Sequence, residues 1–138
     1  MPLPEIRYLT KADLPAIAAI QGDASPWKPQ DYLYFETWVA DVPGQGVVAF
    51  VATRAVYLDE EFEVINLVVG VEHRRNGYGR LLLETVMQRR PGIWFLEVRA
   101  TNHGAISLYK SLSFNQSGVR KDYYQNPPED GIVMVRKP

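Results

Sequence analysis

The stretch EVINLVVGVEHRRNGYGRLLLETVM, residues 63–87, contains three successive kinds of sequence. Residues 63–71 are nearly all apolar, which is typical of a strand buried on both faces. Two glycines and three arginines follow within Arg74–Arg80. From Gly79 to Arg90, apolar residues then recur at helical spacing. We therefore predict a strand, a glycine-rich turn and a helix in direct succession.

The residues before this unit predict a strand, a helix and a second strand. Alternation around Ile6 and Tyr8 indicates a short first strand. A helix should start close to Asp13, because aspartate is a good N-cap and Pro15 suits a first helical turn. Residues 46–58 are β-branched and aromatic and predict a long strand. Between Gly22 and Gly46 the signal is weak, with at most a short helix in a loop.

The residues after the unit predict three more strands and one more helix. IWFLEVRA, residues 93–100, indicates a buried strand, and ATNHG opens a helix. Two last strands, in residues 114–124 and 131–137, flank a turn-forming segment. A strand–helix–strand connection crosses over right-handedly and makes its strands parallel neighbours. The fold class is therefore α/β with a mixed sheet, in a single domain of residues 1–138.

Composition excludes several classes of function. The chain has 138 residues, a net charge of −1 and no cysteine. The near-zero charge provides no field for holding nucleic acid or an anionic membrane, so neither is an expected partner. Without cysteine there are no disulfides and no thiolate metal site. With no apolar leader or membrane span, we expect a cytoplasmic protein.

The glycine-rich turn has the properties of an anion site. A helix N-terminus leaves backbone amides unpaired and carries a partial positive charge. Glycine lets a ligand approach the backbone, and arginine provides paired donors for phosphate. Arg74, Arg75, Asn76, Gly77, Tyr78, Gly79 and Arg80 could therefore hold a phosphate group. The alternative is a plain glycine turn with solvated arginines.

Three segments together resemble the GNAT N-acetyltransferase superfamily. The turn matches R-x-x-G-x-G between a strand and a helix. WFLEVRATNHGAISLYKSLSF, residues 94–114, resembles L-E-V-R-x-S-N-x-x-A-x-x-L-Y-x-x-L-G-F. VRKDYYQNPPEDGIVM, residues 119–134, resembles the ending R-x-x-Y-Y-x-x-x-x-E-D-A-x-x-M. The most similar group is that of the bacterial ribosomal-protein-alanine N-acetyltransferases, and the similarity covers residues 64–134.

The resemblance implies the GNAT fold, with two parallel strands that splay apart, and acetyl-CoA as co-substrate, released as coenzyme A. Arg74–Arg80 would bind its pyrophosphate. The backbone of Leu67, Val68 and Val69 would pair with the pantetheine amides, as an added strand does. Asn102 would lie near the pantetheine arm, although a helix N-cap explains it equally well.

The resemblance also implies two catalytic residues. Tyr109 would face the coenzyme sulfur as the general acid and contact the coenzyme; its alternative is a core aromatic on a helix. Glu97 lies within an apolar strand, where an unpaired carboxylate is costly. It should therefore be paired, for example with Arg99, or act as a general base, directly or through water.

The acceptor is the least determined part of the reaction. A protein N-terminal α-amine suits a single carboxylate base, because losing its proton at pH 7 costs about 1 kcal/mol against about 4.6 for lysine. The resemblance implies that Tyr123 and Tyr124 hold the acceptor, although an aromatic pair of a β-hairpin explains them equally well. Trp27 lies in the segment that walls the acceptor cleft in those families. The rivals are a small-molecule amine or lysine as acceptor, and a non-catalytic acyl-CoA-binding module.

Four further expectations complete the sequence interpretation. The spacing of His73 and His103 suggests no metal site, and His103 should face solvent. Glu129-Asp130 is typical of a solvated turn, and the alternative is that its charge attracts a cationic peptide. Ser113 stands where the family has glycine, so a positive φ there would add strain. We expect a monomer or a homodimer.

Overall fold

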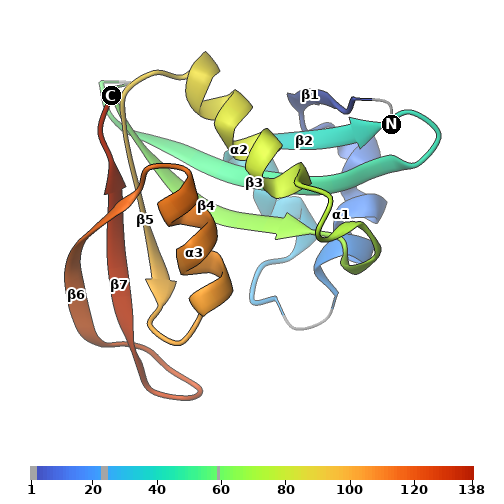
Figure 1. The fold of residues 1–138 in the computed structure, drawn as a ribbon. Coiled ribbons are helices and arrows are strands. Elements are labelled where there is room, and N and C mark those ends of the chain that lie inside the picture. Colours follow the sequence, from blue (N-terminus) through green and yellow to red (C-terminus); the bar gives the residue numbers. More distant parts are fainter. Residues whose placement is uncertain (1–2, 23–24, 59) are drawn as a thin grey trace. The chain divides into compact units, whose positions relative to one another are not determined.

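The computed structural model describes residues 3–22, 25–58 and 60–138. Within these residues, seven strands form one mixed sheet in the order β1-β2-β3-β4-β5-β7-β6 (Figure 1). The chain divides into two compact units. Unit 1 comprises residues 1–54 and 64–90, and unit 2 comprises residues 55–63 and 91–138. The mixed α/β sheet confirms the predicted fold class, and the single domain stays a prediction.

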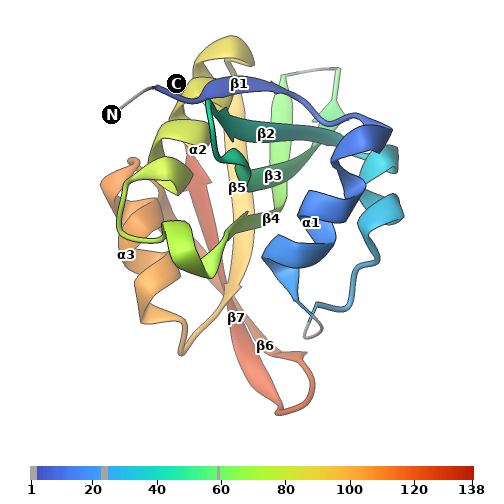
Figure 2. The same ribbon diagram turned by 90° about the vertical axis from the view of Figure 1, so that its right-hand side faces the viewer.

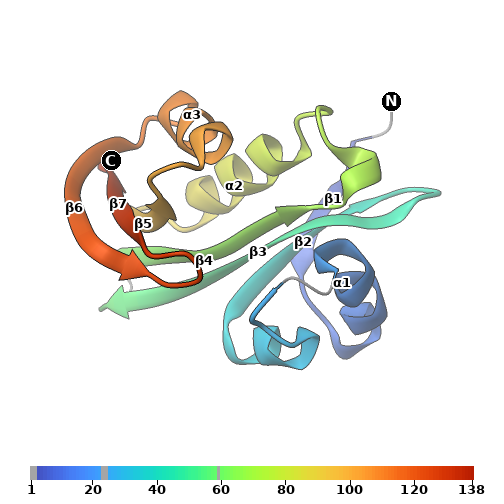
Figure 3. The ribbon, with the colours of Figure 1, turned by 90° about the horizontal axis from the view of Figure 1, so that it is seen from below.

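Unit 1 is a set of strands with a helix on each face. Figure 3 shows helices α1 and α2 on opposite sides of the strands. β1 and β2 are antiparallel, as are β2 and β3. The elements that contribute to this unit are β1 (Glu5–Tyr8), η1 (Lys11–Asp13), α1 (Leu14–Gln21), η2 (Pro29–Tyr34), β2 (Glu36–Val42), β3 (Gly46–Tyr57), β4 (Glu61–Val69), η3 (Val71–His73) and α2 (Tyr78–Arg89).

α1 starts where the sequence predicts, with Asp13 at the N-cap and Pro15 in the first turn, but the Asp13 side chain makes no cap hydrogen bond to the helix. It belongs to an ionic network instead. The Thr10 amide donates to Asp13 Oδ2 at 2.8 Å, and Arg7 donates to both Asp13 oxygens at 2.8 and 2.9 Å. Arg7 also donates to Asp41 at 3.0 Å. The Arg7 hydrogen bonds lower the pKa of Asp13 to about 2.

The weak-signal segment holds a strand that the sequence interpretation missed. η2 agrees with the expected short helix, and β2 follows it directly. Residues 37–40 of β2 are all buried, so the strand shows no alternation of polar and apolar residues. Without alternation, a short apolar run gives no clear strand signal. The buried cluster beneath it comprises Ile17, Tyr32, Val39, Phe50 and Ala52.

Unit 2 is built on β5 (Ile93–Arg99), α3 (His103–Ser111), β6 (Asn115–Tyr124) and β7 (Glu129–Arg136). β4 and β5 are parallel, with Glu61–Glu63 paired to Ile93–Phe95, which confirms that the two strands are parallel neighbours. β7 pairs antiparallel with both β5 and β6. Figure 2 shows β6 and β7 as a long hairpin beside β5.

Two local features of unit 2 position the residues discussed below. Along β5, Trp94, Leu96 and Val98 are buried, whereas the alternate residues, including Glu97, are half-buried. Glu97 therefore lies on the more open face of the strand. After α3, Ser113 has φ 71°, a left-handed conformation that glycine adopts more easily. The departure from the family glycine thus places strain at this turn.

Candidate active site

The glycine loop presents free amides at the start of α2. Gly77 is the N-cap of α2, with φ 77°, and it has no side chain that could accept from the helix amides. From Arg74 to Gly79, the described residues provide no backbone acceptor for the backbone amides. Arg74, Arg75 and Arg80 are exposed beside them. Unpaired amides, a helix N-terminus and three cations together suit an anion.

Glycine is required at the two positions of the loop for different physical reasons. A Cβ at Gly77 would meet nothing within 4 Å, so only its left-handed backbone requires glycine there. A Cβ at Gly79 would lie 3.1 Å from Val69 Cγ2. Gly79 therefore allows α2 to pack closely on β4. The sequence interpretation had given both glycines to the ligand.

Two polar side chains stabilise the loop from within. Arg74 Nε donates to the Val69 carbonyl at 3.2 Å, and Asn76 Nδ2 donates to the His73 carbonyl at 3.2 Å. Tyr78 is buried, with its ring 6.5 Å from the ring of His73. At Tyr78, therefore, only the backbone amide is suited to contact an anion.

The end of β4 is more open than the sequence suggests. Leu67, Val68 and Val69 are half-buried, so the expectation that this strand is buried on both faces was wrong for this segment. An apolar run predicts burial only if both faces of the sheet are covered. Half-buried apolar side chains remain available for contact with a ligand.

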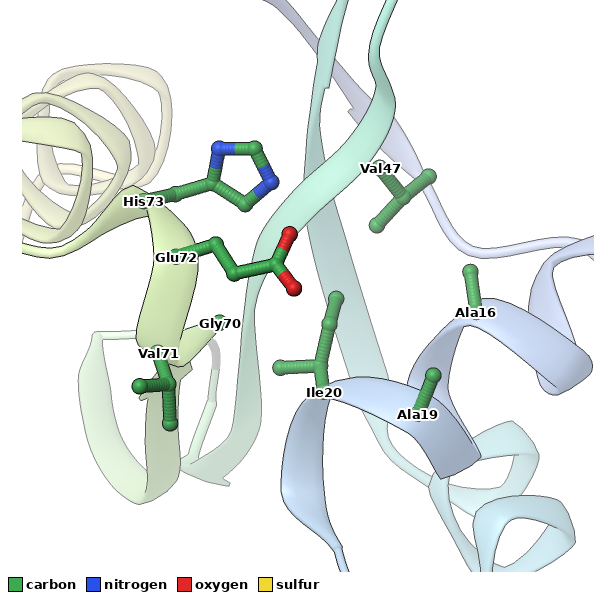
Figure 4. A pocket seen from close by; sticks show the side chains of 8 residues that line it. All are labelled: Ala16, Ala19, Ile20, Val47, Gly70, Val71, Glu72 and His73. Carbon is green, nitrogen blue, oxygen red and sulfur yellow. The ribbon is translucent and has the colours of Figure 1, made fainter.

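A separate cavity lies beside the glycine loop. Its volume is about 270 Å³, and its lining residues are Ala16, Ala19, Ile20, Val47, Gly70, Val71, Glu72 and His73 (Figure 4). None of the residues predicted from the sequence to be catalytic, coenzyme-binding or substrate-binding lines this cavity. The His73 ring faces it, whereas His103 is exposed at the start of α3, as predicted.

In unit 2, Glu97 is paired, but not with the partner suggested by the sequence. Arg120 Nε lies 3.2 Å from Glu97 Oε1. The other oxygen, Oε2, is buried and has no hydrogen-bond partner among the described residues. The expectation of an Arg99 partner was wrong, because Arg99 lies 3.2 Å from Glu129 Oε1 and donates to the Gln125 carbonyl at 2.9 Å.

The Arg99–Glu129 pair closes the end of the β6–β7 hairpin. Glu129 Oε2 also accepts from the Thr101 amide at 2.7 Å. Hydrogen bonds from Thr101, and also from Arg99, lower the pKa of Glu129. Asp130 Oδ1 accepts from the Asp122 amide at 3.0 Å. The expectation of a solvated turn at Glu129-Asp130 was therefore wrong, because both carboxylates have structural partners.

The two tyrosines of β6 lie near the Glu97 carboxylate. Their rings are 5.0 Å apart at an interplanar angle of 83°. The negative charge of Glu97 raises the pKa of Tyr123, and burial, followed by the same charge, raises that of Tyr124. The Arg120 guanidinium lies 5.2 Å from the centre of the Tyr123 ring. The structure thus brings Glu97, Tyr123 and Tyr124 together, as a base beside an acceptor site would require.

Arg120 belongs to this cluster, although the sequence interpretation gave it no role. It lies on β6, and 59% of its side chain is exposed. The signal was present in the sequence, since Arg120 is the arginine of the R-x-x-Y-Y ending. Residues that are distant along the chain meet here because β7 joins β5 to β6.

Tyr109 is a buried phenol on α3. Its ring centre lies 5.7 Å from that of Phe114, and burial raises its pKa to about 12. Its hydroxyl has no hydrogen-bond partner in the described part of the chain. A buried tyrosine usually finds a partner, so this hydroxyl is suited to receive one from a ligand.

The remaining predicted residues have structural contacts that explain them in part. Asn102 is the N-cap of α3 and accepts from the Ala105 amide at 3.2 Å. Trp27 packs against the buried cluster of unit 1, with its ring 5.5 Å from that of Phe35. Their contacts with coenzyme and acceptor stay predictions. No helix in the described ranges is long and apolar enough to cross a membrane.

Comparison with known proteins identifies related sequences and structures. A model of the acetyltransferase (GNAT) family matches residues 4–114. The ribosomal protein bS18-alanine N-acetyltransferase of Escherichia coli K12 is 35% identical over 94% of this chain and 95% of its own length. The crystal structure of the ribosomal-protein-S18-alanine N-acetyltransferase from Escherichia coli has a TM-score of 0.83 at 32% identity, covering 98% of this chain and 94% of its own.

A relative in structure alone has a different acceptor. A spermidine N-acetyltransferase variant from Vibrio cholerae has a TM-score of 0.84 at 17% identity, covering 98% of this chain and 94% of its own. Such a likeness shows the fold and nothing more. The fold therefore does not select the acceptor amine.

Proposed function

Because the chain belongs to the acetyltransferase (GNAT) family, we propose that it transfers acetyl from acetyl-CoA to the α-amine of a protein N-terminus. The name of the 35% identical relative, an alanine N-acetyltransferase of ribosomal protein bS18, supports an α-amine acceptor, such as that of a ribosomal protein. The observation that carries the chemistry is in unit 2. There, Glu97 lies among tyrosines with one carboxylate oxygen free of partners.

Glu97 is the general base in this proposal. An amine attacks the thioester carbon through its nitrogen lone pair, so it must lose a proton. Oε2 accepts this proton, directly or through one water, while Oε1 stays paired with Arg120. An α-amine needs little help at neutral pH, since it is only about 1 kcal/mol from its unprotonated form. One carboxylate base therefore suffices to deprotonate an α-amine but is poorly suited to deprotonating lysine.

Tyr109 is the general acid. As the carbon–sulfur bond breaks, the sulfur takes the electron pair and needs a proton. The Tyr109 hydroxyl donates it, and the pKa of about 12 ensures that the phenol is protonated at every pH at which the enzyme works. The missing hydrogen-bond partner of this hydroxyl supports its role toward a ligand.

Unit 1 supplies the coenzyme contacts. The amides of residues 76–79 fit a diphosphate, because they have no backbone acceptor in the described structure and lie at a helix N-terminus, and the exposed arginines add positive charge beside them. The backbone of Leu67–Val69 contacts the pantetheine arm in this proposal. Asn102 is proposed as a further contact of the pantetheine arm. When bound, acetyl-CoA supplies the activated acetyl group.

Tyr123 and Tyr124 hold the acceptor backbone in this proposal, and Trp27 is a further proposed contact of the acceptor. Support comes from their nearness to Glu97, which is the group that must reach the acceptor nitrogen. Glu129 is unsuited to recruiting a cationic peptide, because Arg99 and the Thr101 amide already occupy it.

The acceptor is tested with acetyl-CoA and a panel of amines, read by mass spectrometry and thiol release. The panel contains peptides with free N-terminal alanine, the same peptides with blocked N-termini and internal lysine, and polyamines. We expect one acetyl group on the free N-termini only. Acetylation restricted to polyamines or lysine would contradict the acceptor, and tight coenzyme binding without thiol release would contradict catalysis.

A further inference from the structure

We propose that Arg120 is a positioning residue: it holds one oxygen of the Glu97 carboxylate so that the other is left open for the acceptor's proton. This inference rests on the proposed function, because it concerns the same base. Arg120 touches neither the coenzyme nor the reacting atoms in this account, and it acts only through Glu97.

The geometry of the pair is asymmetric. Arg120 approaches Oε1 through Nε at 3.2 Å, while Oε2 is buried and has no hydrogen-bond partner among the residues that the structure describes. A buried carboxylate oxygen without a donor is costly, and natural proteins rarely leave one. A ligand that brings an N–H to Oε2 removes this cost. An acceptor amine is such a ligand.

Arg120 is itself held in place by Tyr123. Its guanidinium lies 5.2 Å from the centre of the Tyr123 ring, within the range of a cation–π contact. β6 and β7 are out of regular register between Arg120 and Tyr124, which places these side chains irregularly along the hairpin. The tyrosine, the arginine and the carboxylate thus form one cluster, the Glu97–Arg120–Tyr123 cluster.

The other charged groups near Glu97 do not replace Arg120. Arg99 is engaged by Glu129 and by carbonyls of the hairpin. Tyr123 and Tyr124 are neutral at physiological pH, and Glu63 adds a like charge near Tyr123. Arg120 is therefore the cation paired with Glu97 in the described structure.

The proton path follows from this arrangement. As the nitrogen–carbon bond forms and the carbon–sulfur bond breaks, the amine proton moves to Oε2. Arg120 prevents the carboxylate from rotating, so the same oxygen faces the amine in each turnover. Without Arg120, the carboxylate is less well oriented toward the amine.

The kinetic test compares five variants with the wild type, using the N-terminal alanine peptide. Arg120→Met should lower kcat about tenfold, with both KM values within about twofold of wild type. Arg120→Lys should recover most of the rate. Lys121→Met, an exposed neighbour of equal charge, is the matched control and should resemble wild type.

The double variant separates this inference from the proposed function. With Glu97→Gln as background, Arg120→Met should have no further effect on kcat. An equal loss in both backgrounds would overturn the positioning role, since Arg120 would then act independently of Glu97. If Glu97→Gln keeps the full rate and an unchanged pH–rate profile, Glu97 is not the base, and the positioning role of Arg120 fails as well.

A titration that needs no activity checks the cluster in solution. The charge of Glu97 raises the pKa of Tyr123, and Arg120 opposes this. By NMR, the pKa of Tyr123 should therefore fall in Glu97→Gln and rise in Arg120→Met. No change in either variant would show that the cluster does not form, and the inference would fail even if the enzyme acetylates peptides.

Discussion

The glycine loop and the Glu97–Arg120–Tyr123 cluster are built in opposite ways. The loop is one contiguous segment, residues 74–80, between β4 and α2. Its donors are backbone amides, which are available wherever a helix begins without a capping side chain. The cluster joins two distant strands, β5 and β6, and depends on side chains. We infer that the loop binds the coenzyme and that the cluster takes part in acetyl transfer. Substitutions in the two regions should therefore have different kinetic effects.

The largest expected effect comes from the acid. Tyr109→Phe removes one hydroxyl from a buried ring and should lower kcat by about 100- to 10,000-fold, with KM for acetyl-CoA almost unchanged. Steady-state kinetics check this. Tyr57→Phe, at an exposed tyrosine, is the control. Normal turnover with lost coenzyme affinity would mean that Tyr109 binds rather than reacts, which would break the contrast between the two regions.

A change outside both regions should alter stability alone. Arg7 lowers the pKa of Asp13 to about 2, below its ordinary value. This interaction is therefore fully present above about pH 4 and is lost as the pH falls toward 2. Asp13→Asn should cost about 2 kcal/mol of unfolding free energy at pH 7, measured with denaturant, and nearly nothing at pH 2.

The control for Asp13 is a surface partner of the same arginine. Glu5 is 71% exposed and lies 3.6 Å from Arg7 Nε. Because exposed pairs contribute little, Glu5→Gln should leave stability nearly unchanged. Equal losses in the two variants, or a loss at Asp13 that persists at pH 2, would contradict the network as described.

A change in the loop should affect binding without affecting the chemical step. Gly77 has φ 77°, and a side chain there adds about 1–2 kcal/mol of strain. If the loop shifts to relieve this strain, its amides move away from the diphosphate of the coenzyme. Gly77→Ala should therefore raise KM for acetyl-CoA about tenfold and leave kcat within about twofold. Gly104→Ala, at a glycine without positive φ and with open space, should change neither constant.

The smallest expected effect is a stabilisation. Ser113 has φ 71°, so Ser113→Gly relieves strain, partly offset by the flexibility of glycine when unfolded. The net gain should be about 0.5 kcal/mol in a denaturant titration, with unchanged kinetics. A loss of stability would show that the serine side chain makes a favourable contact that outweighs the strain.

Local patterns predicted most of the fold. Hydrophobic period and capping chemistry are properties of neighbouring residues, so α1, α2 and the strands on either side of α2 were predicted near their observed bounds. β2 was missed because residues 37–40 are buried without alternation. The sequence also suggested that β4 is buried on both faces, because it cannot show which sheet face is covered.

The parts of the site that depend on the backbone of one segment were predicted from the sequence. The parts that depend on pairing between distant side chains were predicted less well. The amides of the glycine loop follow from one segment, and Asn102 is the N-cap that its residue type suggested. The partner of Glu97 could not be derived in this way. Arg99 shares its strand face, but the hairpin carbonyls and Glu129 engage Arg99, and β7 brings Arg120 to Glu97 instead.

The central claim is that backbone amides between Arg74 and Arg80 bind a diphosphate and so hold the thioester for transfer. A crystal structure of the protein with coenzyme A tests this most directly. We predict the diphosphate within hydrogen-bond distance of the amides of residues 76–79, with Gly77 still left-handed. A coenzyme bound elsewhere, with these amides paired to protein oxygens, would contradict the account.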